Sequence, residues 1–160
     1  MKAIVIYYSY SGNTKKVADI LADYLKQGRE VKVLRLEAMD ESDSFFIQAA
    51  RALFRMKAKI ASLDFDLSSY DLICLGSPVW AFAPAPAMNT YLEGCFGLED
   101  KSIALFTTYG SGTGVSRCFN YMQNILSKRG AKDFRKFSIQ QFKVNDKEFI
   151  NKVIGENLKL

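Results

Sequence analysis

Five apolar segments alternate with five segments of helical periodicity along this chain, and that alternation restricts the fold more than any other feature. Strands are predicted at residues 3–8, 30–36, 70–76, 101–107 and 134–139. Helices are expected from Thr14 to Gly28, after caps within 42–44, from Pro86 to about Cys95, from Val115 to near Gly130, and after a cap at Asn145 or Asp146. Strands that alternate with helices form a parallel sheet covered on both faces, so the predicted fold class is α/β.

The length of 160 residues, without any linker or low-complexity segment, favours one domain that spans residues 1–160. No apolar run approaches the ~20 residues that a membrane-spanning helix needs, so we expect no membrane span. A strand begins directly at the N-terminus, with no segment typical of a secretory signal. These features favour a cytoplasmic protein.

The chain contains three cysteines and no histidine. Cys74, Cys95 and Cys118 are widely spaced and form no Cys-x-x-Cys pair, so neither a disulfide framework nor a zinc site is indicated. The absence of histidine removes Ser-His-Asp and Cys-His catalysis. We therefore expect an imported cofactor to supply the chemistry.

The first predicted strand ends in a polar turn, Ser9-Tyr10-Ser11-Gly12-Asn13-Thr14, that opens the first helix. The unpaired N–H groups and the positive dipole end of a helix start favour an anion, most often phosphate. The hydroxyls of Ser9, Ser11 and Thr14 can add donors, and Gly12 lets the backbone approach closely. The turn lacks a cation and the pattern of triphosphate-binding loops, which favours a terminal phosphate monoester; an ordinary helix cap is the alternative.

Two further loops of unusual composition follow predicted central strands. Residues 77–86 contain all three prolines and the single tryptophan, Trp80, whereas residues 108–114 are rich in threonine and glycine around Tyr109. With the strand order 2-1-3-4-5, the loops after strands 1, 3 and 4 converge beyond the carboxyl ends of the strands. Taken alone, each aromatic residue is explained by a core plug or a loop anchor. Together with the polar turn, the two loops predict a site for a phosphate at one end and a flat ring at the other.

The polar turn and its flanks, Tyr7–Thr14 followed by Val17-Ala18, resemble the signature of the flavodoxin family. Gly76–Trp80 and Thr107–Gly110 resemble the two ring-binding loops of that family, and the order of elements agrees over the whole chain. The resemblance implies a single-domain, flavodoxin-like, three-layer α/β/α sandwich with a five-stranded parallel sheet. It also implies one noncovalent FMN and a redox function.

The resemblance assigns particular residues to the FMN. Those that would hold the phosphate are Ser9, Tyr10, Ser11, Gly12, Asn13 and Thr14. Those that would flank one side of the isoalloxazine are Pro78, Val79, Trp80, Ala81 and Phe82, and those that would cover the other side are Thr108, Tyr109, Gly110 and Gly112. Carriers of this family often have a glycine in the loop after the third strand. Residues 77–86 contain none, so a positive φ there would fall on a residue with a Cβ.

Three other kinds of site are disfavoured. A response-regulator receiver needs acidic residues after the first strand and an aspartate after the third, where this chain has Ser9 and Gly76-Ser77. A low-molecular-weight tyrosine phosphatase needs Cys-x5-Arg, and none of the cysteines begins that motif. A dinucleotide site at Gly110–Gly114 is weaker, because its spacing is G-x-G-x-G and no acidic residue follows the last strand closely.

The charge leaves two functional alternatives open. Electron-carrier flavodoxins are strongly acidic, whereas this chain has a net charge of +5, and residues 101–160 contain 11 basic against four acidic residues. The preferred hypothesis is a carrier, monomeric or dimeric, that exchanges electrons with a redox partner protein. The alternative is an NAD(P)H-dependent FMN reductase or quinone oxidoreductase with a small acceptor. No nucleic-acid-binding motif accompanies the basic residues, so a solvated face is favoured over a nucleic-acid or lipid surface.

Overall fold

The computed structural model describes residues 1–38, 47, 50, 60 and 64–158. Its strands are β1 (Lys2–Tyr7), β2 (Glu30–Arg35), β3 (Leu72–Trp80), β4 (Ala83–Pro84), β5 (Ser102–Tyr109) and β6 (Asp133–Gln140). Its helices are α1 (Asn13–Leu25), α3 (Pro86–Gly94), α4 (Val115–Ser127) and α5 (Lys147–Leu158), with a 3-10 helix, η1, at Gln141–Lys143. The helix predicted after residues 42–44 lies almost entirely outside the described residues.

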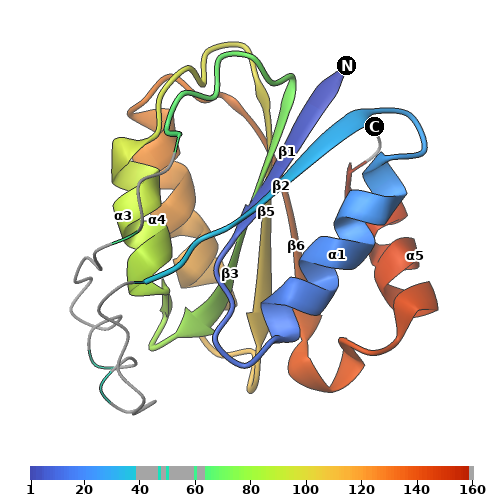
Figure 1. The fold of residues 1–160 in the computed structure, drawn as a ribbon. Coiled ribbons are helices and arrows are strands. Elements are labelled where there is room, and N and C mark those ends of the chain that lie inside the picture. Colours follow the sequence, from blue (N-terminus) through green and yellow to red (C-terminus); the bar gives the residue numbers. More distant parts are fainter. Residues whose placement is uncertain (39–46, 48–49, 51–59, 61–63, 159–160) are drawn as a thin grey trace.

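The sheet has the order β2-β1-β3-β5-β6, and all neighbours in this order are parallel. The two-residue strand β4 pairs antiparallel with β3 and lies off this path. The five long strands therefore have the predicted order. Figure 1 shows α1 and α5 on one face of the sheet and α3 and α4 on the other. The α/β class and the three-layer α/β/α arrangement are confirmed.

Each face of the sheet packs a separate apolar core. Leu21 of α1 and Ile150 of α5 belong to one cluster, together with Phe106 of β5. Ile73 of β3 and Met122 of α4 belong to the other. Because both faces of the central strands are covered, their sequences are continuously apolar rather than alternating.

Two strands extend further than the sequence predicts. β3 continues to Trp80 and β5 to Tyr109, so residues 77–80 and 108–109, which were expected in loops, are strand residues. The reason is pairing, because Ser77 aligns with Thr107 and Pro78 with Thr108, and Trp80 pairs with Ala83 in a hairpin. The elongated strands carry their last residues into the region where the loops converge.

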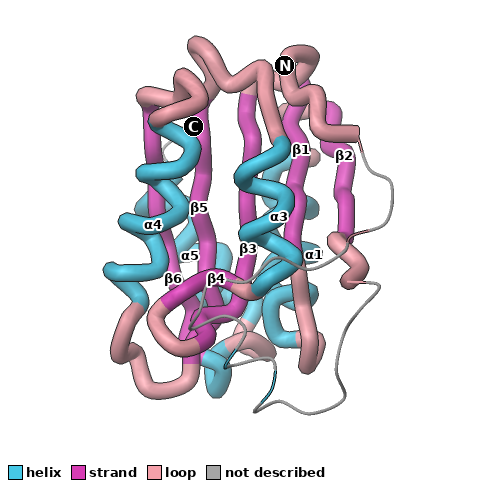
Figure 2. Tube along the Cα trace, turned by 90° about the vertical axis from the view of Figure 1, so that its left-hand side faces the viewer, coloured by secondary structure: helices cyan, strands magenta, loops and turns pink. Residues whose placement is uncertain are grey.

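The carboxyl ends of the strands lie at the lower end of the sheet in Figures 1 and 2, and β4 lies near that end as well. At the same end, the backbone N–H of Phe149 donates to Asp146 Oδ1 at 3.0 Å, so Asp146 rather than Asn145 caps α5. In the part of the chain that the structure describes, no helix combines the length and apolarity that crossing a bilayer requires.

Candidate functional site

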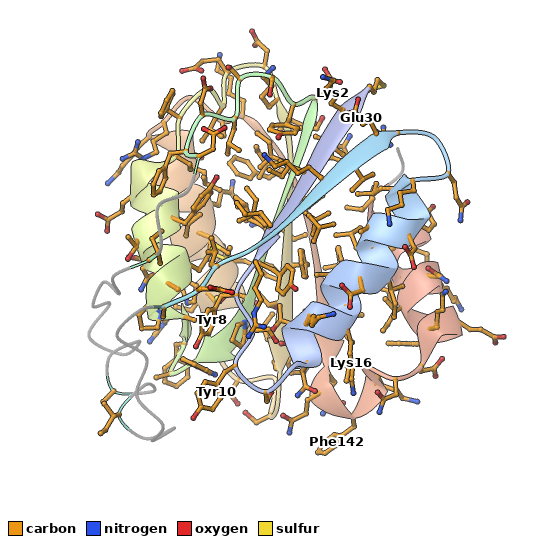
Figure 3. All side chains as sticks on the ribbon, in the orientation of Figure 1. Lys2, Tyr8, Tyr10, Lys16, Glu30 and Phe142 are labelled. Atoms are coloured by element: carbon orange, nitrogen blue, oxygen red, sulfur yellow. The ribbon has the colours of Figure 1, made fainter. Side chains whose placement is uncertain are left out.

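A cavity of about 510 Å³ opens at the carboxyl end of the sheet. Its walls come from the turn after β1, the end of β3, the end of β5 with its loop, and η1. The lining residues are Tyr10, Ser11, Asn13, Thr14, Pro78, Val79, Trp80, Thr108, Tyr109, Gly110, Ser111 and Gln141. Figure 3 shows Tyr8 and Tyr10 toward this end of the molecule, opposite Lys2 and Glu30. The three segments of unusual composition therefore meet as the sequence predicts.

The turn after β1 forms one end of this cavity. Gly12 is the N-cap of α1 with φ 88°, a left-handed conformation that strongly favours glycine, and it supplies no side-chain cap. A Cβ on Gly12 would meet nothing within 4 Å, so its backbone conformation, rather than crowding in the protein, requires the glycine. Ser9 Oγ accepts the N–H of Lys15 at 3.2 Å and holds the turn against the helix start. The first two residues of α1 lack intrahelical acceptors for their N–H groups and line the cavity together with Ser11.

A buried hydroxyl pair joins this turn to the end of β5. Thr14 Oγ1 and Thr108 Oγ1 lie 2.8 Å apart, and the two residues are 1% and 3% exposed. Residues 94 positions apart in the chain are joined in this way. The hydrogen bond between these hydroxyls holds the two segments together. Removal of either hydroxyl would leave the other buried without this partner, which is costly.

Trp80, at the end of β3, also lines the cavity, and its ring packs against two tyrosines. Its ring makes T-shaped contacts with Tyr8, at 5.7 Å between centroids, and with Tyr10, at 5.6 Å. Trp80 is only 6% exposed, although it lines the cavity. The indole is therefore packed in advance against the segment that carries the polar turn.

The hairpin between β3 and β4 has an unusual backbone. Ala81 and Phe82 have φ values of 45° and 69°, although neither is glycine. Two positive φ values in a two-residue hairpin are typical of a type I′ turn, which glycine or asparagine usually occupies. Phe82 packs against Gly114, where a Cβ would lie 2.4 Å from its ring, and the Arg117 guanidinium lies 5.3 Å from the ring centroid. Tertiary packing therefore holds a locally unfavourable turn.

Substitution of Ala81 by glycine is expected to raise the free energy of unfolding by about 1 kcal/mol, because it relieves a left-handed alanine. Urea unfolding followed by circular dichroism measures the change. Ala85→Gly is the matched control: this residue has φ −59° and is fully buried, so glycine there should destabilise the protein. Destabilisation by Ala81→Gly would contradict the strained turn.

A second, shallower cavity of about 390 Å³ lies beside the hairpin. Its lining residues are Phe82, Gly112, Thr113, Gly114, Ser116 and Arg117. The same two segments line both cavities. Residues 78–80 and 108–111 line the first, and residues 82, 112–114, 116 and 117 line the second. Phe82 and Gly112, which the resemblance assigned to the flavin, thus lie at the second cavity.

The remaining predicted residues fall into two groups. Ten of them line the first cavity: Tyr10, Ser11, Asn13, Thr14, Pro78, Val79, Trp80, Thr108, Tyr109 and Gly110. Ser9, Gly12 and Ala81 line neither cavity; the first two shape the polar turn, and Ala81 lies in the hairpin. The assignment of these residues to a cofactor stays a prediction.

Sequence reasoning missed Ser111 and Gln141, which also line the first cavity. Gln141 follows β6, and the neighbouring Gln140 Nε2 donates to the carbonyl of Gly110 at 3.1 Å. The strand order could have indicated Gln141. Because β6 is parallel to β5, the segment after β6 reaches the same edge of the sheet as the loop after β5. Ser111 lay within the loop already singled out.

The three cysteine thiols are buried, and burial disfavours their reactive thiolate form. Cys74 and Cys118 are fully buried, and burial raises the pKa of each thiol to about 12. Burial likewise raises the pKa of Cys95 to about 11. Among the described residues, no group of three histidine, cysteine, aspartate or glutamate side chains is placed to hold a metal ion. The site consists of hydroxyls, backbone amides and aromatic rings.

Known proteins share this fold. A flavoprotein from Lactobacillus acidophilus NCFM, solved in complex with FMN, is 21% identical with a TM-score of 0.63, covering 92% of this chain and 98% of that one. Oxidised flavodoxin 1 from Bacillus cereus is 20% identical with a TM-score of 0.63 over 98% of both chains. A flavodoxin from Streptococcus pneumonia TIGR4 is 15% identical with a TM-score of 0.58, covering 98% of this chain and 99% of that one.

A family comparison goes beyond the likeness of folds. The family model described as flavodoxin matches residues 2–153, which span all the described strands and most of α5. The match includes the polar turn, the β3–β4 hairpin and the loop after β5. This chain therefore belongs to the flavodoxin family.

Proposed function

We propose that this chain is a flavodoxin-like redox protein that binds one FMN noncovalently and carries electrons between partners. The observation that carries the proposal is the cavity at the carboxyl end of the sheet, which joins a hydroxyl- and amide-rich turn to an aromatic wall. Family membership supports the same cofactor, and one structural neighbour was solved in complex with FMN.

The donors of the polar turn fit a phosphate monoester. The first N–H groups of α1 have no helical acceptor, and Ser11 and Asn13 line the cavity beside them. Ser9, Gly12 and Thr14 would act mainly through the shape of the turn, because Ser9 and Thr14 make internal hydrogen bonds and Gly12 provides the left-handed cap. The phosphate would therefore be held by hydroxyls and amides that the fold arranges in advance.

The aromatic side of the cavity fits a flat ring system. Trp80 and Tyr109 line it from two different strands, with Pro78 and Val79 beside the indole. Gly110 has no side chain to cover its backbone N–H at this edge, where a polar atom of a ring could pair with it. Its carbonyl already accepts a hydrogen bond from Gln140. When bound, FMN supplies the redox chemistry; the protein orients the ring, excludes water from it and tunes its potential.

The alternative is an NAD(P)H-dependent reductase of quinones or similar acceptors, and the second cavity favours it. That cavity adjoins the ring end and contains an aromatic side chain, Phe82, beside a cation, Arg117. A carrier remains the better reading because the family match covers nearly the whole chain as a flavodoxin. The partners would be a redox protein for the carrier, or NAD(P)H and a small acceptor for the reductase.

One experiment tests the cofactor and separates the two readings. The purified chain is titrated with FMN and with riboflavin by flavin fluorescence, and the FMN complex is then mixed anaerobically with dithionite and, separately, with NADPH. We expect one FMN per chain, weaker riboflavin binding, rapid reduction by dithionite and slow reduction by NADPH. Rapid bleaching by NADPH would favour the reductase. Failure of both flavins to bind would overturn the proposed function.

A further inference from the structure

Arg35, the last residue of β2, lies beside the proposed phosphate turn although the sequence places it 26 residues away from Ser9. Its position is fixed by pairing: Arg35 aligns with Tyr7 across the β1–β2 ladder, and the N–H of Leu36 donates to the carbonyl of Tyr7 at 2.8 Å. Since Tyr7 ends β1 two positions before Ser9, this pairing holds the backbone of Arg35 beside the segment that leads into the turn.

The side chain of Arg35 reaches the turn itself. Its Nη2 donates to the carbonyl oxygen of Ser9 at 3.3 Å. A guanidinium carries five N–H donors, and this contact uses one of them. The Ser9 carbonyl is a neutral acceptor. This hydrogen bond therefore brings the positive charge of Arg35 to the turn and does not neutralise it.

Within the described part of the chain, two other cations lie near the turn, but each is directed elsewhere. Lys15 Nζ lies 2.6 Å from Asp19 Oδ2, and this hydrogen bond is the main reason that the pKa of Lys15 is raised. The positive charge of Arg35 opposes the rise in the pKa of Lys15. Lys16 Nζ donates to Asn145 Oδ1 at 2.7 Å, toward the start of α5.

We propose that Arg35 is the counter-charge of the phosphate site and makes the site select a flavin phosphate over an unphosphorylated flavin. This inference rests on the proposed function. Arg35 acts by long-range attraction and by holding the Ser9 carbonyl, while the amides and hydroxyls of the turn make the contacts. A cation supplied by β2 complements a turn that contains none of its own.

The expected effect is moderate and depends on salt. Arg35 is exposed, so its attraction for a phosphate dianion acts partly through water and is screened by ions. Removal of the charge should weaken FMN binding by roughly tenfold at low ionic strength, with less than about twofold change for riboflavin. The difference should shrink when the Debye length falls from about 30 Å in ~0.01 M salt to about 3 Å in ~1 M salt.

The experiment compares Arg35→Gln, Arg35→Lys and the control Lys32→Gln, which removes the same charge from an exposed position on the same strand. For each, the dissociation constants of FMN and riboflavin are measured by fluorescence quenching at both salt concentrations. We expect Arg35→Gln to lose FMN affinity selectively, Arg35→Lys to recover part of it, and Lys32→Gln to resemble the parent chain. Circular dichroism confirms that each variant is folded.

The outcomes distinguish failure of this proposal from failure of the proposed function on which it rests. If the parent chain binds FMN but Arg35→Gln and Lys32→Gln have the same effect, or FMN and riboflavin weaken equally, Arg35 is not the counter-charge and the proposed function stands. If the parent chain binds neither flavin, both proposals fail. A selective FMN loss that persists unchanged in ~1 M salt would also overturn the electrostatic role.

Discussion

Replacement of Gly76 with alanine is expected to lower the free energy of unfolding by about 3 kcal/mol. A Cβ at this position would lie 2.0 Å from Cζ of Phe106, and both other atoms nearest to it belong to the same ring. Phe106 cannot move aside easily, because it is fully buried and stacks on Phe137 with the ring planes 10° apart. Position 76 therefore requires glycine, because only a residue without a Cβ leaves room there for the ring of Phe106 on β5.

Urea unfolding of Gly76→Ala and Gly28→Ala measures this effect against a matched substitution. Gly28 has no atom within 4 Å of an added Cβ and no positive φ, so its replacement should change stability by less than about 1 kcal/mol. Phe106→Leu in the Gly76→Ala background should cost less than Phe106→Leu alone, since the smaller side chain relieves the overlap. Equal costs of the two glycine substitutions would refute the crowding at Gly76.

The fold could be predicted because each strand and helix has its own sequence pattern and the same strand–helix unit repeats along the chain. Continuously apolar strands such as residues 101–107, separated by helices with one apolar face, leave few topologies once connections must be short and right-handed. The turn at Ser9–Thr14 could be recognised for the same reason, since hydroxyl residues and a glycine between a strand and a helix predict a helix start that can bind an anion. The structure bears out the order of the five long strands and the convergence of the loops after the central ones.

The hairpin was not predictable, because tertiary contacts determine its backbone. A segment without glycine gives no local reason for positive φ, yet Ala81 and Phe82 both adopt it. The Phe82 ring packs on Gly114 and under Arg117, more than 30 residues later in the chain, and these contacts offset the local cost. Gly114 therefore has a role that only the folded structure explains.

Residues at the ends of flanking strands were missed for a related reason. Gln141 and Arg35 follow or end strands whose sequences have no unusual composition, and nothing nearby marks them as part of a site. Their side chains reach the central loops only because β6 and β2 lie beside β5 and β1 in the sheet. A prediction of strand order brings such residues to the correct edge but does not say which side chains turn inward.

Trp80→Ala is expected to weaken FMN binding by about 1–3 kcal/mol, roughly five- to 150-fold in Kd, through lost ring contact and lost burial. The same substitution should lower the free energy of unfolding by about 3 kcal/mol, because Trp80 is 6% exposed and packs against Tyr8 and Tyr10. The two effects have different origins, since one requires the flavin and the other is present in the free protein.

Leu126→Ala separates these effects. Leu126 is fully buried near the end of α4, away from the N-terminal end of that helix, which borders the second cavity. Its truncation should cost a comparable free energy of unfolding without weakening FMN in the folded protein. Binding is measured by fluorescence quenching at a temperature where both variants are folded, and stability by urea unfolding without flavin. If Leu126→Ala weakens FMN as much as Trp80→Ala, or if Trp80→Ala leaves Kd unchanged, the indole does not contact the flavin ring, and the wall of the cavity that recognises it must lie elsewhere.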